Sequence, residues 1–365
     1  MKINIAFVIY SLSSGGAERV VSTLSNGLIE KYNVFIITLV ESKPFYIIDD
    51  RIKLIHLENK IPPSTNIINS ILLNKRLYKK LAENFKIFQI KLAIGFMTNT
   101  NIITVFASKK AHIPVLISER NNPKLEKTSM FWKILRRIAY PLSNKLIVQT
   151  NPIRDHYLNY IKYDDISILP NPISTEHQKI RKSHKIIKEN IILNVGRLAP
   201  QKGQDIIINA FSELNPKNWE LHLIGDGPKR IEYQELINSL NMQSKIKIIG
   251  KISDITEYYL RSKIFVFPSR YEGFPNALTE AMFLGLPVVS SNCPTGPSEL
   301  IIDSENGYLV PVDDIRLFKD KMKLLINDEP LRESIGFNAS NSLNHLIADN
   351  VVAQWTIIIE ENLKS

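Results

Sequence analysis

The sequence has 365 residues, of which 44 % are hydrophobic and 22 % charged, which is typical of a globular protein with room for two domains. No segment approaches the roughly 18 consecutive apolar residues of a membrane-spanning helix, and the apolar N-terminus runs into a polar loop without a cleavage pattern, which favours a buried strand over a signal peptide. The single cysteine, Cys293, excludes an intramolecular disulfide and fits a reducing cytoplasm, and no Cys/His group has zinc spacing.

The net charge of +10 is concentrated in the first half of the chain. Residues 1–170 contain 24 Lys and Arg against 12 Asp and Glu, whereas residues 171–365 contain 22 against 24. Such asymmetry suggests that the first half faces a polyanionic surface. No nucleic-acid-binding motif is visible, so we expect an anionic membrane surface and no nucleic acid; the alternative is a solvated basic face without a partner.

The first half alternates short apolar runs with helical patterns. Strands are expected at residues 3–9, 34–40, 52–56, 92–96, 115–118 and 146–149, and helices at about 17–31, 66–86, 129–140 and 152–160. Two of these helices, at 66–86 and 129–140, are basic and contribute Lys75, Arg76, Lys79, Lys80, Lys133, Arg136 and Arg137. Near the second of them, apolar Phe131 and Trp132 either enter a lipid headgroup layer or pack against the domain's own sheet.

A glycine pair, Gly15 and Gly16, lies in the first β–α turn, where a backbone that approaches a ligand closely carries no side chain. Paired glycines are a weak signal, because dinucleotide-binding folds use them too. The rest of the G-x-G-x-x-G pattern, with an acidic residue about twenty positions later, is absent here.

The second half begins after a polar, lysine-rich segment at 174–190, which we interpret as a linker. Strands are expected at 191–195, 220–224, 246–249 and 264–267, with helical patterns between them and a last helix at about 348–363. Because β–α alternation continues through both halves, the sequence predicts two parallel-sheet domains with helices on both faces.

The stretch from 267 to 290 places two carboxylates around one strand–loop–helix unit. Glu272 falls in the loop after the strand at 264–267, and Glu280 lies about two turns later in a helix at 277–284, before a further strand at 286–289. Ligands of parallel sheets bind at this edge, so both carboxylates and the N–H groups of 273–277 are expected to converge on a polyhydroxylated, phosphorylated ligand. The alternative is a pair of surface carboxylates at a helix start.

Two cations, Arg197 and Lys202, follow the strand at 191–195 in N-V-G-R-L-A-P-Q-K-G. The planar fork of an arginine and the point charge of a lysine bind phosphate oxygens in complementary ways, so this segment suits a phosphorylated ligand. No Asp-x-Asp stands at a strand end. Cys293 is interpreted as a packed residue rather than a nucleophile, because no base is near it in sequence.

The segment E-G-F-P-N-A-L-T-E-A-M resembles the Glu-x7-Glu signature of the retaining, family-4 glycosyltransferases of GT-B architecture. Four further segments resemble the same family: S-S-G-G-A-E-R, P-N-P-I, N-V-G-R-L-A-P-Q-K-G and S-N-C-P-T-G-P-S-E, the last in a variant of a polysaccharide-building subgroup. A G-D-G-P turn at 225–228 is also similar, and we interpret it chiefly as a tight turn. The resemblance covers nearly the full chain.

The resemblance implies an α/β fold of two Rossmann-like domains facing across a cleft. The acceptor-side domain is expected at 1–172, completed by the C-terminal helix at 348–365, and the donor-binding domain at 173–347. Implied roles are the transferred sugar for Glu272, the ribose for Glu280 and the diphosphate for Arg197 and Lys202. These two cations would stabilise the charge that the leaving diphosphate gains in the transition state and so take the place of a metal. Donor-binding residues are expected to be Gly15, Gly16, Arg197, Lys202, Glu272, Gly273, Phe274, Pro275, Asn276, Ala277, Glu280, Thr295 and Gly296, with Glu272, Arg197 and Lys202 catalytic.

On the acceptor side, the resemblance implies Glu119, Arg120 and Asn121. Many relatives carry S-E-H where this chain has S-E-R, so a histidine-based role at the reaction centre is not expected here. The implied reaction moves a hexose or N-acetylhexosamine from a UDP-sugar to a polyprenyl-diphosphate-linked saccharide, in O-antigen, capsule or exopolysaccharide synthesis. No metal or other cofactor is expected, and the enzyme would be cytoplasmic and peripheral on the inner face of the plasma membrane.

Two other classes remain open. One is a GT-B-fold nucleotide-sugar epimerase or phosphorylase, and the other is a catalytically silent partner subunit. The presence of Glu272, Arg197 and Lys202 argues against the silent subunit.

Overall fold

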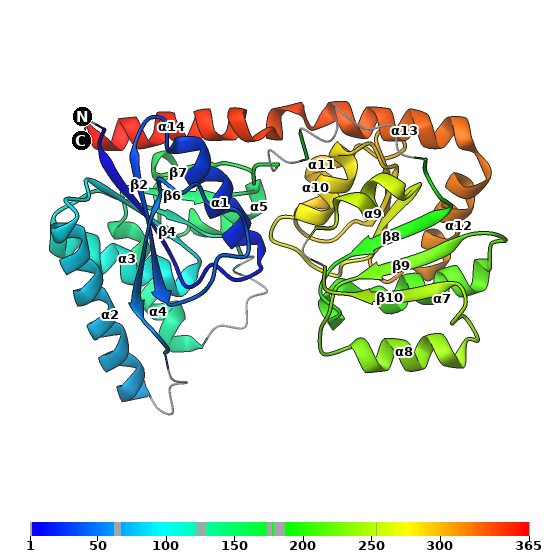
Figure 1. The fold of residues 1–365 in the computed structure, drawn as a ribbon, viewed down its shortest axis with the longest axis horizontal. Coiled ribbons are helices and arrows are strands. Elements are labelled where there is room, and N and C mark those ends of the chain that lie inside the picture. Colours follow the sequence, from blue (N-terminus) through cyan, green and yellow to red (C-terminus); the bar gives the residue numbers. More distant parts are fainter. Residues whose placement is uncertain are drawn as a thin grey trace. The chain divides into compact units, whose positions relative to one another are not determined.

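The structure is a computed structural model that describes residues 2–61, 67–121, 123, 129–173, 177–178, 187–252 and 254–364. The chain forms two compact units, Met1–Pro172 with Ala348–Ser365, and Ile173–Ile347 (Figure 1). Most of the expected linker, at 174–176 and 179–186, lies outside the described residues. Each unit is built on one parallel sheet, as the β–α alternation predicted, and the two units are described separately below.

The first unit contains a seven-stranded sheet with the order β3-β2-β1-β4-β5-β6-β7, in which every pair is parallel. Its strands are β1 Asn4–Ile9, β2 Asn33–Val40, β3 Lys53–Glu58, β4 Leu92–Phe96, β5 Val115–Ser118, β6 Lys145–Val148 and β7 Ile166–Ile168. Its α-helices are α1 Gly16–Leu28, α2 Ile67–Ile87, α3 Thr98–Ala111, α4 Met130–Ala139, α5 Asn151–Tyr157 and α14 Ala348–Leu363. The chain winds from β1 to β3 in one direction and from β4 to β7 in the other, so the topological switch lies between β1 and β4.

Helix α14 is the last element of the chain and completes the core of the first unit (Figure 1). Its Trp355 is fully buried and stacks on Phe96 of β4, with ring centroids 6.0 Å apart. Val351, Ile358 and Ile359 join the same apolar cluster as the inner faces of β1 and α1. Burial of side chains of this size stabilises a fold by about 1.5–3 kcal/mol each, so the C-terminal helix is part of this unit's core.

The second unit contains a six-stranded parallel sheet with the order β10-β9-β8-β11-β12-β13. Its strands are β8 Ile191–Val195, β9 Glu220–Ile224, β10 Ile246–Gly250, β11 Ile264–Phe267, β12 Val288–Ser291 and β13 Tyr308–Val310. Its α-helices are α7 Gln204–Leu214, α8 Arg230–Ser239, α9 Thr256–Arg261, α10 Asn276–Phe283, α11 Pro297–Leu300, α12 Ile315–Asn327 and α13 Glu329–Ser342. Here the winding reverses between β8 and β11, which makes these two strands neighbours.

One strand differs from the sequence-based expectation. The run at 286–289 predicted a strand that begins at Leu286, whereas β12 begins at Val288. Pro287 has no N–H to donate to a neighbouring strand, although its carbonyl still accepts from the Phe265 N–H at 3.0 Å. Leu286 is nevertheless fully buried. The apolar pattern therefore located the buried residues, and proline chemistry set where pairing starts.

No helix in the described part of the chain is both long and apolar enough to cross a bilayer.

Candidate functional site

Most of the residues expected to bind the donor lie at one edge of the second unit's sheet. The loops after β8, β9, β11 and β12 all leave the carboxyl ends of parallel strands, so they gather at the same edge. Arg197 and Lys202 follow β8, Glu272 follows β11, and Thr295 follows β12. Since the winding reverses between β8 and β11, the loops that carry Lys202 and Glu272 are neighbours at the switch point, where open α/β sheets bind ligands.

Lys202 and Glu272 form an ion pair at this switch point. The Lys202 Nζ lies 2.6 Å from the Glu272 Oε1, and it also lies 5.5 Å from the centroid of the Phe267 ring. The Lys202 side chain is 22 % exposed and the Glu272 side chain 6 % exposed. Two charges withdrawn from water in this way must compensate each other, and each fixes the position of the other. The structure thus brings together two predicted residues that are seventy positions apart.

A second ion-pair network ties the two loops to each other. Arg270 donates from Nη2 to the Asp205 Oδ2 and from Nε to the Asp313 Oδ1, both at 2.7 Å. Gln201 donates from Nε2 to the Tyr271 carbonyl at 2.9 Å, and its backbone carbonyl accepts from the Arg270 N–H at 2.8 Å. The network therefore holds Lys202 and Glu272 in register.

Sequence reasoning missed the role of Arg270. The available signal was its place three residues after a buried strand and two residues before Glu272, where a charged residue without a local partner needs a long-range one. Asp205, in the first turn of α7, gave no comparable signal, because an acidic residue at a helix start is common on grounds of the helix dipole alone.

Glycines let these loops pack backbone against backbone. Gly203 has φ +63°, and a Cβ there would overlap the Pro268 carbonyl oxygen. Gly225 has φ +143°, and a Cβ there would overlap the Gly196 carbonyl oxygen. Both positions therefore require glycine on two counts, conformation and space. At both positions the space requirement comes from the protein's own backbone.

Glu280 lies in α10 and is only 5 % exposed. Its Oε2 accepts a hydrogen bond from the Tyr259 hydroxyl at 3.2 Å, and the same hydroxyl lies 3.3 Å from the Ala277 carbonyl. Tyr259 is fully buried, so it sets the position of the carboxylate. This partner was not anticipated from the sequence, because Tyr259 belongs to α9 and precedes the strand.

The start of α10 presents backbone N–H groups, as helix N-termini do, and Pro275 at its N-cap has no side chain that caps them. The Asn276 N–H is already used by the Phe274 carbonyl, at 3.1 Å. The Thr295 hydroxyl donates to the Glu272 carbonyl, and Gly296, at φ +99°, packs against the Pro275 ring. Of the predicted donor-binding residues, Thr295 and Gly296 therefore brace the Glu272–Pro275 turn.

The remaining residues at this edge are Arg197 and Cys293. The Arg197 side chain is exposed, while its carbonyl accepts from the Gln204 Nε2 at 3.1 Å. Cys293 is buried, and burial, together with the nearby Glu272, raises the pKa of its thiol to about 12. Its thiol is therefore neutral near pH 7, which agrees with a packed residue.

In the first unit, the predicted acceptor segment follows β5, and Gly15 and Gly16 follow β1, at the same edge of that sheet. Glu119 is fully buried. Its carboxylate accepts from the Tyr140 hydroxyl at 2.6 Å, the Thr98 hydroxyl at 2.9 Å and the Arg120 N–H at 3.0 Å. These bonds make Glu119 an anchor of the loop.

Arg120 is 9 % exposed and lies over the Phe96 ring, with its guanidinium carbon 5.0 Å from the centroid. Its Nη1 donates to the Asn171 side chain, and burial lowers the pKa of Arg120. The Nε and Nη2 groups are buried and have no hydrogen-bond partner among the residues that the structure describes. Buried donors of this kind are rare in folded proteins, so these two mark a place where a ligand oxygen would fit.

Among the residues that the structure describes, no group of three or more His, Cys, Asp and Glu side chains is placed to hold a metal ion.

Comparison with known proteins assigns each half of the chain to a family model. Residues 14–177 match the model of Glycosyltransferase Family 4, and residues 176–342 match that of Glycosyl transferases group 1. Among curated proteins, a Campylobacter jejuni N-acetylgalactosamine-N,N'-diacetylbacillosaminyl-diphospho-undecaprenol 4-alpha-N-acetylgalactosaminyltransferase is 30 % identical over 89 % of this chain and 91 % of that protein. The amylovoran biosynthesis glycosyltransferase AmsD of Erwinia amylovora is 26 % identical over 95 % and 96 %.

Solved structures share the fold. The crystal structure of Anabaena HepE in complex with UDP-glucose superposes with a TM-score of 0.81, covering 98 % of this chain and 100 % of that chain at 17 % identity. The lipopolysaccharide outer core galactosyltransferase WaaB superposes with a TM-score of 0.76 at 20 % identity, covering 98 % and 99 %.

Proposed function

Because this chain belongs to the family-4, group-1 glycosyltransferases, we propose that it transfers a hexose or N-acetylhexosamine from a UDP-sugar to a polyprenyl-diphosphate-linked saccharide, with retention of the anomeric configuration. The observation that carries this proposal is the Lys202–Glu272 pair, 2.6 Å apart at the switch point of the second sheet. Relatives named for diphospho-undecaprenol acceptors and for amylovoran biosynthesis support a role in bacterial surface-polysaccharide assembly.

For the donor, Arg197 and Lys202 hold the diphosphate. In the reaction the bond between the sugar C1 and the β-phosphate oxygen breaks, so the leaving UDP gains negative charge. Because Glu272 holds Lys202 in place, the lysine can stabilise that negative charge without moving during the reaction. Charges that are already in position lower the reaction barrier most. Arg197, whose side chain is exposed, adds a planar fork suited to phosphate oxygens.

Glu272 orients the transferred sugar and does not attack it. Its carboxylate is already compensated by Lys202, which lowers its nucleophilicity while leaving lone pairs free to accept from sugar hydroxyls. In the proposed step the acceptor oxygen bonds to C1 on the face that UDP leaves, and the acceptor's proton passes to the departing β-phosphate oxygen. Glu280, oriented by Tyr259, accepts from the ribose hydroxyls.

On the acceptor side, the unpartnered Nε and Nη2 of Arg120 are the donors offered to a hydroxyl or carbonyl oxygen of the saccharide. Asn121 stands beside them and is half-buried. Glu119 is assigned a positioning role, because its bonds to Tyr140 and Thr98 hold the segment that carries Arg120.

The test of this function is incubation of the purified protein with bacterial membrane lipid extract and a panel of UDP-sugars, with products identified by mass spectrometry. A lipid-linked saccharide lengthened by one sugar residue supports the proposal. Interconversion of UDP-sugars without transfer would identify an epimerase instead, and a requirement for inorganic phosphate would identify a phosphorylase. No turnover of any sugar by the folded protein would favour the silent subunit.

Metal independence is a separate expectation. Chelation with EDTA should leave the transfer rate within about twofold, because Arg197 and Lys202 supply the positive charge at the diphosphate. The measurement is the initial rate before and after chelation, with Mg²⁺ and Mn²⁺ added back. Loss of activity that either metal restores would contradict the expectation.

We also propose that the basic first unit attaches the enzyme peripherally to the anionic inner face of the plasma membrane. Lys75 and Lys79 of α2 are exposed, whereas Arg76 and Lys80 form ion pairs with Glu58 at 3.0 and 2.9 Å and so offer less net charge. On α4, Phe131 and Trp132 are half-buried and pack edge to face against each other. The apolar residues of α4 that do face solvent are Met130, Ile134 and Ile138.

Binding to phosphatidylglycerol vesicles should therefore be strong at low salt and weaken as salt rises, since each basic residue near such a surface is worth about 1 kcal/mol. The measurement is co-sedimentation with and without phosphatidylglycerol over a salt series. Replacing Lys75, Arg76, Lys79 and Lys80 with Glu should abolish most of the bound fraction. Binding that does not depend on lipid charge or salt, or that is unchanged by this replacement, would exclude the basic face of α2 as the membrane-binding surface.

A further inference from the structure

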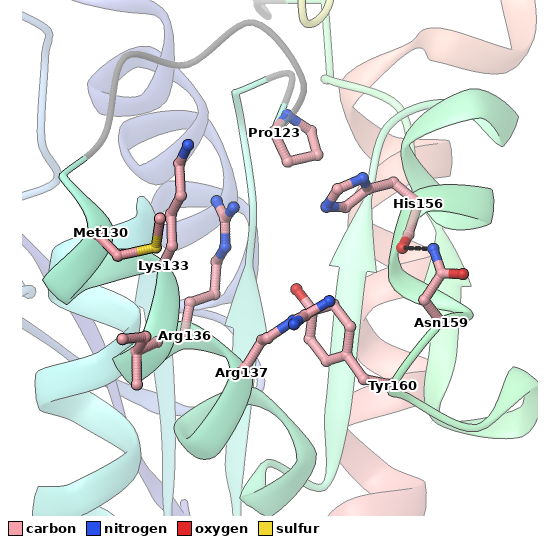
Figure 2. A pocket seen from close by; sticks show the side chains of 9 residues that line it. Pro123, Met130, Lys133, Arg136, Arg137, His156, Asn159 and Tyr160 are labelled. Atoms are coloured by element: carbon pink, nitrogen blue, oxygen red, sulfur yellow. Dashed lines mark hydrogen bonds between the residues drawn. The ribbon is translucent and has the colours of Figure 1, made fainter.

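The first unit contains a pocket that none of the roles above uses (Figure 2). It lies between α4 and α5, has a volume of about 380 Å³, and falls in the size range of small-ligand sites, which is roughly 300–1,000 Å³. It is lined by Pro123, Met130, Lys133, Ile134, Arg136, Arg137, His156, Asn159 and Tyr160. In Figure 2, Lys133, Arg136 and Arg137 project from α4 and His156 points back toward them from α5.

One wall of this α4–α5 pocket is strongly basic. Lys133, Arg136 and Arg137 supply three cationic side chains, and none of the described residues that line the pocket carries a carboxylate. Arg136 is 5 % exposed, with its guanidinium carbon 5.9 Å from the centroid of the Tyr157 ring, and Arg137 lies 5.8 Å from that of Tyr160. The buried Glu119 accepts from the Tyr157 hydroxyl at 3.4 Å and acts electrostatically on Arg136, but it does not line the pocket.

This arrangement matches the chemistry of a phosphate or diphosphate. Guanidinium groups held over aromatic rings are partly ordered before a ligand arrives, so less conformational entropy is lost when they bind phosphate oxygens through paired hydrogen bonds. An ammonium group, from Lys133, adds a point charge beside them. His156 and Asn159 supply further polar groups at the rim.

The other edge of the pocket is apolar and exposed. Met130 and Ile134 line it, and their exposed fractions are 69 % and 52 %. Ile138, one turn further along the same helix face, is 53 % exposed. Exposed apolar side chains spaced four residues apart, directly beside a cationic pocket, suit a ligand that joins an anion to a hydrocarbon chain.

An apolar groove of about 350 Å³ lies on the opposite flank of α4. Helix α4 contributes Phe131, Trp132 and Leu135 to it, and α2 and α3 supply the remaining wall. The residues that line it are Ile71, Asn74, Lys75, Tyr78, Ile102, Ile103, Phe106, Phe131, Trp132 and Leu135. A helix with its side chains is about 10–12 Å across, so a long hydrocarbon chain that leaves the basic pocket reaches this groove by crossing one helix.

We propose that the α4–α5 pocket binds the diphosphate of the lipid-linked acceptor, with the prenyl chain crossing the exposed face of α4 toward the apolar groove. The acceptor's identity rests on the proposed function; the chemistry of the pocket does not. Pro123 lines the pocket and lies only three residues after Arg120, which keeps a saccharide attached to the bound diphosphate within reach of the Arg120 donors. The pocket would thus hold the acceptor at its lipid end.

The test is a binding measurement that needs no sugar transfer. The protein is first saturated with UDP, so that the donor site is occupied, and is then titrated calorimetrically with farnesyl diphosphate, inorganic diphosphate, farnesol and short-chain phosphatidylglycerol. Farnesyl diphosphate should bind at least tenfold more tightly than inorganic diphosphate, and the other two ligands should bind more weakly still.

Three variants separate the parts of the site. The double variant Lys133→Glu with Arg137→Glu, at two exposed positions, should weaken the binding of farnesyl diphosphate and of inorganic diphosphate at least thirtyfold. Lys86→Glu with Lys91→Glu makes the same charge change at the far end of α2 and before β4, and should leave both affinities within twofold. The double variant Ile134→Ser with Ile138→Ser should weaken the binding of farnesyl diphosphate only. A melting temperature for each variant confirms that it is folded.

An equal loss of diphosphate affinity in the first two variants would show a general charge effect and overturn the proposed site. Equal affinity for farnesyl and inorganic diphosphate would overturn the lipid-linked ligand, and so would phosphatidylglycerol binding as tightly as farnesyl diphosphate. A protein that transfers sugar but binds no prenyl diphosphate contradicts only this inference. One that binds it but transfers no sugar contradicts only the proposed function.

Discussion

Replacing Lys202 with alanine should lower kcat/KM at least 100-fold while leaving the enzyme folded. The lysine is the fixed cation at the proposed diphosphate position, and a lost charge-assisted contact to a developing anion costs about 3 kcal/mol, which is roughly a 100-fold change in rate. The substitution also leaves Glu272, which is 5 % exposed, without its partner. The measurement is steady-state kinetics with the UDP-sugar that the panel assay identifies.

A double-mutant cycle distinguishes the two consequences. Glu272→Ala alone should also reduce kcat/KM at least 100-fold, and the double variant should lose far less than the product of the two single losses, because the pair acts as one unit. Lys217→Ala, an exposed lysine of the same unit, serves as the matched control and should stay within twofold. Near-normal turnover in the folded Lys202→Ala variant would remove this residue from the site.

The second large effect is expected at Glu280. Its replacement with alanine should lower kcat/KM at least 100-fold, because a carboxylate that accepts from two ribose hydroxyls makes two charge-assisted hydrogen bonds, each worth about 1.5–3 kcal/mol. The loss should appear mainly as weaker binding of UDP, measured by calorimetry. Lys202 and Glu272, the proposed catalytic groups, remain in place in this variant.

Tyr259→Phe provides the matched comparison for Glu280. It removes the hydroxyl that lies 3.2 Å from the Glu280 Oε2 and keeps the buried ring, so it tests orientation of the carboxylate apart from its presence. UDP affinity should fall less than tenfold in this variant. If Glu280→Ala and Tyr259→Phe had equal effects, the carboxylate would be a structural partner of Tyr259 and the ribose contact would be ruled out.

The second unit also shows how a strongly charged pair is kept in a fixed position. The pair itself spans two loops, and each loop is fastened by a contact that carries no ligand role: Arg270 to Asp205 and Asp313, and Gln201 to the Tyr271 carbonyl. Gly203 permits the close approach of these loops, because a side chain there would overlap the Pro268 carbonyl oxygen. Preorganisation of the proposed diphosphate site is therefore a property of the whole edge of the sheet.

Local sequence determined the elements and the family of this protein. Apolar runs of four to eight residues alternating with helical periodicity predicted two parallel sheets, and the structure confirms both. The Glu-x7-Glu segment and the G-R-L-A-P-Q-K-G segment indicated the family, which the comparisons confirm. Such signals are readable because strand, helix and turn preferences depend on residues that are neighbours along the chain.

Only the tertiary structure decided which polar groups meet. Glu119 was expected to face the acceptor, yet the fold buries it completely under the hydroxyls of Tyr140 and Thr98, and leaves the unpartnered donors of Arg120 beside it. Lys202 pairs with Glu272 because β8 and β11 are adjacent where the winding reverses. Helices α4 and α5 enclose a basic pocket that no sequence motif predicted. The physical reason is the same in each case: burial and pairing depend on strand order and helix packing over separations of tens of residues, which local propensity does not encode.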